Sequence, residues 1–334
     1  MRNMWTTTSL LGALIVACAW TTCSAMEIAT GSNLPPGYKI IEGDIIVPID
    51  FTFEGQSGGR GTSGVFTTSL WTGGTVPYAF NANVSAANQT AAINAMAEWE
   101  AVANLNFVAR TTQSDYIAFN DSDENSSMVG RQGGKQTINI YNWNMRFRIA
   151  HEIAHSLGCW HEQSRTDRDT YLIVDTSVVE ADARHNYDRH DEADVYGPYD
   201  FGSVMHYGEC YFVSGCSCPA DCRAMTVRAA YNGTCDNGDC QSTMGQRDHL
   251  SRVDILTMQM LYPNAGDVFV DKDYTGATQN GAFRTPYKTF TGGYNAVASG
   301  GRVIVQPGTY TGCVRSYTKR AVVRAPLGGV VLKQ

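Results

Sequence analysis

The stretch that decides the fold reads His151-Glu-Ile-Ala-His155-Ser-Leu-Gly158-Cys-Trp-His161-Glu162, and it holds three of the seven histidines of the chain. Helical residues four positions apart lie one turn above each other, so a helix presents His151 and His155 on one face. Gly158 is suited to end that helix in a left-handed conformation. The chain can then turn and bring His161 to the same point, so the spacing predicts a metal site.

Three imidazoles leave one coordination position of a metal ion free for water, as in catalytic zinc sites. Glu152 follows the first histidine directly. A glutamate beside such a site can act as general base when zinc-bound water attacks a carbonyl carbon. The pattern therefore predicts one Zn²⁺ ion held by His151, His155 and His161, and amide hydrolysis as the chemistry. The alternative is an amphipathic helix with surface histidines, but the added glutamate, glycine and third histidine favour the metal.

The segment resembles the extended zinc signature of metzincin peptidases, and Glu162 after the third histidine resembles the astacin family. A second match is Ser203-Val-Met205-His-Tyr207-Gly208, which is similar to the Met-turn of that family. The resemblance implies that Met205 forms an apolar floor below the zinc and that His206 supports the turn. It also implies that Tyr207 can coordinate the resting metal ion and stabilise the oxyanion during catalysis.

Further stretches resemble the astacin family between residues 62 and 262, among them Trp71–Tyr78, Arg165–Asp169 and Gly245–Ser251. The implied fold class is α+β: a metzincin catalytic domain of two subdomains, with a mixed sheet and an active-site helix. Apolar spacing predicts packing helices over 89–105 and 251–261, the second after a Ser-x-x-Asp capping box. Short β-type runs predict strands at 106–109, 116–119 and 136–141. The resemblance adds an edge strand near 127–130, where a substrate could pair antiparallel.

Upstream, Ile40-Ile-Glu42-Gly43-Asp44-Ile45 resembles the pro-segment motif of the family. The resemblance implies that Asp44 occupies the open zinc position in a latent form, whereas a plain turn is the alternative. The Gly-rich residues 56–64 are an accessible cleavage region, and Arg60 could direct a trypsin-like activating protease. Removal of the segment would activate the enzyme, and its new amino terminus would fold towards Glu162.

The amino-terminal residues suggest export. One positive charge at Arg2 precedes an apolar stretch over 10–20, which predicts a signal peptide cleaved after Ala25 and a secreted protein. A lipobox-like run ending at Cys18 leaves a membrane-tethered lipoprotein as the alternative.

Cysteine usage points to the same compartment. Six cysteines lie within 31 residues: Cys210, Cys216, Cys218, Cys222, Cys235 and Cys240. This clustering favours disulfides over a second metal site. For Cys159 we expect a disulfide, with a buried thiol as the alternative.

Residues after Pro263 change in character and resemble the opening of right-handed parallel β-helix domains. We expect a short β-rich, β-helix-like tail that either contacts polysaccharide or a cell surface or braces the catalytic domain. The expected organisation is a signal peptide (1–25), a pro-segment (26–60), an astacin-like zinc metallopeptidase domain (61–262) and a β-helix-like segment (263–334).

Composition narrows the partners. The net charge is −7 and no basic run occurs, which excludes nucleic acid as an expected partner and leaves protein or peptide substrates. His185, His190 and His249 lack ligand spacing, and we expect them at the surface. The chain is thus expected to be a secreted zinc metalloendopeptidase made as a zymogen. The rival hypothesis is a catalytically silent surface-binding protein that works through residues 263–334.

Overall fold

The computed structural model describes residues 34–51, 69–190, 197–215, 222–314 and 316–334. The expected signal peptide, the lipobox-like Cys18 and the cleavage region around Arg60 lie outside these residues. Among the described residues, every helix is too short or too polar to cross a membrane.

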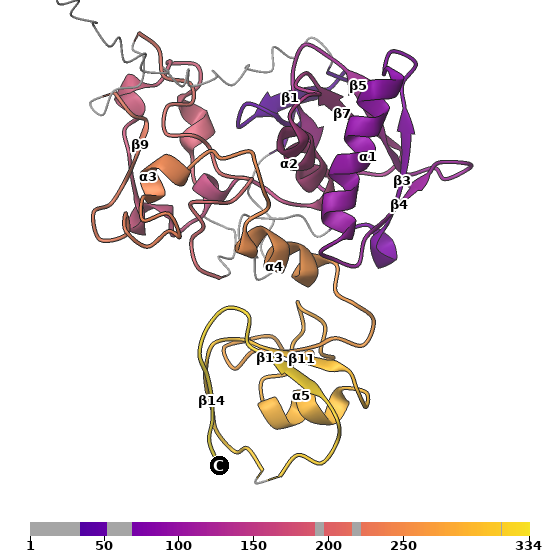
Figure 1. Cartoon of the computed structure of the whole chain (residues 1–334), viewed down its shortest axis with the longest axis vertical. Helices are drawn as coiled ribbons and strands as arrows, with labels where there is room; N and C mark the ends of the chain where they lie inside the picture. The colour runs from indigo at the N-terminus through magenta and orange to yellow at the C-terminus, as the bar shows by residue number, and fades with distance from the viewer. Residues whose placement is uncertain (1–33, 52–68, 191–196, 216–221, 315) are drawn as a thin grey trace, which may run out of the picture.

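A four-stranded sheet and two long helices form the first part of the region between residues 69 and 262 (Figure 1). The strand order is β4-β3-β5-β7, and each neighbouring pair is parallel. An antiparallel bridge between Ser126 and Asn139 joins the segment before β6 to β7, which makes the sheet mixed as expected. The bounds of these elements are β3 Thr75–Phe80, α1 Ala86–Glu100, β4 Asn106–Ala109, β5 Tyr116–Asp121, β6 Ser127–Met128, β7 Lys135–Ile140 and α2 Arg146–Leu157.

Helix α1 differs from its predicted range of 89–105 at both ends. It begins after Ser85, whose side chain accepts a hydrogen bond from the backbone N–H of Asn88. It ends at Glu100, because the chain must leave the helix to enter β4 at Asn106. The apolar spacing continued past the true end because Val102 and Ala103 still pack against the core.

Two tryptophans fix α2 within the main core. Trp99 of α1 donates a hydrogen bond from Nε1 to Ala150 O at 3.0 Å, and Trp71 donates from Nε1 to Ser156 O at 2.9 Å. Both indole rings are almost fully buried. A buried indole N–H needs an acceptor, so these two bonds set the height and rotation of α2, the helix that carries the first two histidines.

The second part of this region contains little regular structure and has an aromatic core of its own, which includes Tyr187, Tyr199, Phe201 and Tyr211. Helix α4 follows the capping box expected from the sequence and packs its inner face into the first core. The elements are β8 Leu172–Val174, β9 Met225–Val227, α3 Cys240–Thr243 and α4 Arg252–Leu261.

The cysteine-rich loop carries disulfides. Cys235 and Cys240 form a disulfide, and Cys210 and Cys222 are disulfide-bonded. Cys159 and Cys313 are buried free thiols, so the expected disulfide of Cys159 is wrong. Cys159 belongs to the core cluster that also contains the buried side of α2. The described residues of that core include no second cysteine with which Cys159 could pair.

The tail consists of short parallel ladders and one helix (Figure 1). Strand β11 pairs in parallel with β10 and β13, and β12 pairs in parallel with β14. The assignment of this segment to a β-helix domain stays a prediction. The bounds are β10 Val268–Val270, α5 Phe290–Ala296, β11 Arg302–Val305, β12 Gly308–Tyr310, β13 Val322–Arg324 and β14 Val330–Leu332.

The upstream segment folds as a hairpin of β1 Tyr38–Ile41 and β2 Ile45–Pro48. Strand β2 pairs in parallel with β6, with Ile45 opposite Ser127 and Ile46 opposite Met128. Strand β2 of the hairpin therefore occupies the edge that was expected to receive a substrate strand.

Candidate metal centre

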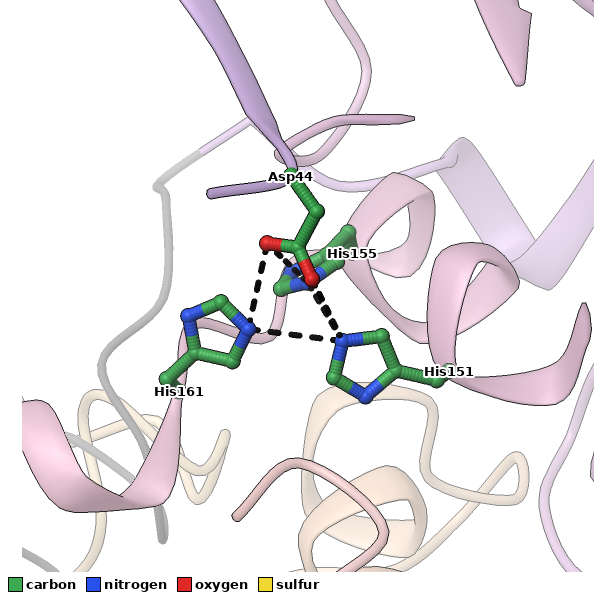
Figure 2. Close-up of side chains that lie close together, drawn as sticks. All are labelled: Asp44, His151, His155 and His161. Carbon is green, nitrogen blue, oxygen red and sulfur yellow. Dashed lines mark hydrogen bonds and ion pairs between the residues drawn. The ribbon is translucent and has the colours of Figure 1, made fainter. Parts of the chain in front are cut away.

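The three histidines of the zinc-type signature converge with Asp44 at one buried point (Figure 2). Nε2 of His151 lies 3.1 Å from Nε2 of His155 and 3.3 Å from Nε2 of His161. The Asp44 carboxylate faces them from the tip of the β1–β2 hairpin, with Oδ2 3.2 Å from His151 and Oδ1 3.2 Å from His161. All four residues are at most 4% exposed.

Local geometry brings the third histidine to the first two. Helix α2 ends at Leu157, and Gly158 follows with φ of 117°, the left-handed conformation that its position in the sequence predicted. The turn lets the chain reverse within three residues, so His161 approaches from outside the helix. An alanine at position 158 would be strained in this conformation.

The ring nitrogens indicate which atoms can bind a cation. Nδ1 of His151 lies 2.8 Å from Val204 O, and Nδ1 of His155 lies 2.7 Å from Cys159 O. Because a carbonyl oxygen can only accept, both Nδ1 atoms carry the proton, and both Nε2 atoms present lone pairs to the common point. Burial lowers the pKa of His151 to about 4 and that of His155 well below its usual value, so both rings are neutral and their Nε2 atoms can bind a cation.

Converging lone pairs repel each other unless a cation lies between them. The buried Oδ1 atom of Asp44 faces two of these nitrogens, 3.2 Å from His161 Nε2 and 3.7 Å from His155 Nε2. Three imidazole nitrogens and one carboxylate oxygen suit zinc in a four-coordinate site. The donor set therefore fits a zinc ion.

Glu152 lies on α2 beside the first histidine and is buried. Within the part of the chain that the structure describes, its Oε2 atom has no hydrogen-bond partner. Burial and the nearby Asp44 carboxylate raise the pKa of Glu152 well above its usual value. A carboxyl group whose pKa is raised in this way holds a proton more readily than an exposed glutamate does.

The turn with Met205 and Tyr207 packs against the ligands. Met205 belongs to the same core cluster as Ile153, Ala154 and Leu157 of α2. The Tyr207 ring lies 4.6 Å from the ring of His161, and its hydroxyl donates a hydrogen bond to Glu42 O of the hairpin. The tyrosine thus contacts the backbone of the β1–β2 hairpin.

His206 lies under the turn, as the resemblance implied. It is fully buried between Tyr207 O, 2.7 Å from Nδ1, and the hydroxyl of Tyr199, 2.8 Å from Nε2. Burial lowers the pKa of His206 to about 3, so the ring is neutral and serves to hold the turn.

Glu162, expected near a new amino terminus, is engaged within the catalytic region. Its Oε1 atom accepts hydrogen bonds from Arg165 Nη1 at 3.1 Å and from the Asp200 backbone N–H at 2.9 Å. Burial raises the pKa of Glu162 to about 8, and Arg165 partly opposes that rise.

Two titratable residues near the site were not recognised from the sequence. His190, expected at the surface, is buried against the Trp160 ring, because the hairpin covers it and places Glu42 on its Nε2 atom. Glu42 also accepts from His161 and Ser164. The only available signal was the Glu-Gly-Asp motif, which presents two carboxylates separated by one residue. His185 and His249 are exposed, as expected.

Comparison with known proteins agrees with this geometry. The family model for the astacin peptidases matches residues 65–263. Flavastacin from Elizabethkingia meningoseptica is 39% identical over 161 residues, which cover 48% of this chain and 33% of that protein. The low choriolytic enzyme of Oryzias latipes is 30% identical over 189 residues, which cover 56% of this chain and 65% of that protein. The chain thus spans less than two thirds of the length of these relatives.

A solved structure matches the same region. High choriolytic enzyme 1, a hatching enzyme zinc-protease from Oryzias latipes, aligns with a TM-score of 0.50 and 28% identity, over 58% of this chain and 92% of that one. The family match extends over more than half of the chain and includes the three histidines, Glu152 and the Met205 turn. The chain therefore belongs to the astacin family of zinc peptidases.

Proposed function

We propose that this chain is the latent precursor of a secreted zinc endopeptidase, with Asp44 as the residue that keeps it inactive. The observation that carries the proposal is the contact of the Asp44 carboxylate with all three histidine Nε2 atoms, at 3.2 to 3.7 Å. An anionic oxygen at this point competes with water for a metal ion. Disulfides in the cysteine-rich loop support secretion, because they persist in oxidising compartments.

Catalysis requires that the hairpin leave. One zinc ion, held by His151, His155 and His161, would lower the pKa of a water molecule and polarise the scissile carbonyl. Glu152 would take the proton of that water on its unpartnered Oε2 atom and deliver it to the departing amine. Its raised pKa suits both steps, since the same carboxyl must accept and then donate.

Tyr207 has the role of an oxyanion donor in this proposal. Its hydroxyl now donates to Glu42 O, so departure of the hairpin would free the donor beside the His161 ring. A buried hydroxyl that points to the developing charge can stabilise a tetrahedral intermediate. Strand β6 would be uncovered at the same time and could receive a peptide by antiparallel pairing.

Processing near Arg60 would separate the hairpin from the catalytic region. The test is cleavage of a peptide library by the full chain before and after treatment with a trypsin-like protease, with zinc content measured throughout. We expect activity only after treatment, and early activity from Asp44→Ala. Glu152→Gln should retain zinc and lose orders of magnitude in rate.

The matched control is Glu98→Gln, because Glu98 forms a partly exposed ion pair with Arg146 and does not belong to the group of residues around the metal position. Substantial cleavage by the Glu152→Gln variant would exclude the proposed base. A processed wild-type chain that holds zinc and cleaves no peptide would favour the rival hypothesis of a silent binding protein.

A further inference from the structure

A second buried carboxylate lies next to the metal centre, at Glu42. Three donors converge on it: His161 Nδ1 lies 2.6 Å from Oε2, Ser164 Oγ lies 3.0 Å from Oε1, and His190 Nε2 also contacts Oε1. Glu42 is 4% exposed, and none of the three donor residues exceeds 3%. A carboxylate so deeply buried is costly unless all of its partners are in place.

The hairpin tip is shaped to deliver this group. Glu42 has φ of 48° and Gly43 has φ of 75°, so both residues at the tip adopt left-handed backbone. A non-glycine residue in this conformation is under strain that the surrounding contacts must offset. The turn directs Asp44 to Nε2 of His161 and Glu42 to Nδ1 of the same ring.

The donors belong to the catalytic region and not to the hairpin. Ser164 and His190 lie 122 and 148 residues from Glu42 in sequence, and both reach the carboxylate and not the metal position. His190 is further held by the Trp160 ring, 4.9 Å between centroids. The catalytic region therefore positions the donors, and the hairpin places the Glu42 carboxylate among them.

We propose that His161 Nδ1, Ser164 and His190 form a carboxylate-binding site beside the metal centre, and that Glu42 of the pro-segment is its occupant. The proposal rests on the proposed latency and adds a second anchor to it. Asp44 blocks the metal position, whereas Glu42 holds the hairpin through donors that do not bind metal with the same atoms. Both contacts hold the hairpin, so loss of either one should weaken its retention.

The test is hydrogen exchange of the full zinc-loaded chain, read by mass spectrometry over residues 45–47 of β2, with α1 as internal reference. Loss of a buried, hydrogen-bonded charge is costly, so Glu42→Gln should speed exchange in β2 by at least about 30-fold and leave α1 unchanged. Asp50→Asn is the matched control, because Asp50 is an exposed carboxylate of the same segment, and it should change nothing.

A double-mutant cycle tests whether Ser164 and His190 bind the Glu42 carboxylate. In Ser164→Ala or His190→Ala chains, the added effect of Glu42→Gln should fall below about 5-fold, since partners in contact are not additive. The proposed carboxylate site would be wrong if Glu42→Gln changed β2 exchange no more than Asp50→Asn does. It would also be wrong if Glu42→Gln had the same effect in the wild-type, Ser164→Ala and His190→Ala chains. Unchanged α1 exchange in each variant verifies that the fold is intact.

Asp44→Ala separates this inference from the proposed function. If that variant stays inactive and its β2 amides stay protected, the latency proposal itself fails. If it releases β2 while Glu42→Gln does not, only the carboxylate site is overturned.

Discussion

Asp254 connects helix α4 to the metal centre, and its replacement by alanine is the most informative test of how the fold holds the ligands. Its carboxylate accepts hydrogen bonds from Ser203 Oγ at 2.6 Å and from the backbone N–H groups of Val204 and Ser251, each at 2.9 Å. Val204 also presents its carbonyl to Nδ1 of His151. Asp254 therefore orients His151, the first histidine of the proposed zinc site, through the main chain of Val204.

The magnitude follows from these contacts. Asp254→Ala leaves two buried backbone donors without their acceptor, and each such loss costs about 1–3 kcal/mol. Part of this is offset because the buried carboxylate is itself costly, as the raised pKa of Asp254 indicates. We expect a net loss of about 3 kcal/mol in the free energy of unfolding. Zinc affinity should fall about 10- to 100-fold, the usual effect of removing a group that orients a metal ligand.

Urea unfolding of the full chain and zinc competition with a chelator are the two assays. The matched control is Asp239→Ala, since Asp239 also accepts hydrogen bonds from two backbone N–H groups, those of Gln241 and Ser242 at the start of α3. That variant should lose about 1 kcal/mol and keep its zinc affinity. Equal zinc affinity in the two variants would refute the role assigned to the Val204 backbone.

Three further outcomes are expected. Gly245→Ala should lower the free energy of unfolding several times more than Gly238→Ala. Both residues have positive φ, but a Cβ at Gly245 would lie 2.5 Å from Gly208 Cα, whereas a Cβ at Gly238 would meet open space. Similar urea midpoints for the two variants would contradict this. Burial raises the pKa of Asp200 from 3.8 to about 7, so its stabilising effect is complete below about pH 4 and is lost as the pH rises through about 7. Asp200→Asn should therefore flatten the plot of unfolding free energy against pH between 4 and 7, and an unchanged slope would count against the shift. Removal of zinc by a chelator should lower the thermal midpoint of unfolding, and one equivalent of zinc should restore it. The reason is that a ligand that binds only the folded chain stabilises the folded chain. A midpoint that does not change with the chelator would be inconsistent with the metal centre.

Much of the site could be predicted from short-range pattern. The helical spacing of His151 and His155 and the left-handed Gly158 depend on residues three to four positions apart, where backbone geometry alone decides the neighbours. The Ser251 to Asp254 capping box is predictable for the same reason, and it is present in the structure. The likeness of the histidine and Met205 segments to a known family then supplied the fold class.

The tertiary structure decided which distant groups meet. His190 could not be distinguished from a surface histidine, because its burial depends on a hairpin about 150 residues away along the chain. The free thiol of Cys159 and the early end of α1 are likewise set by packing and by the path of the chain, not by local preference. The sequence alone determined the spacing of the histidines and the residues that begin and end the helices, since these features depend on neighbours within one or two helical turns. Only the folded chain determined that Glu42 and Asp44 approach one imidazole from both sides, because that meeting depends on the whole path of the chain between them.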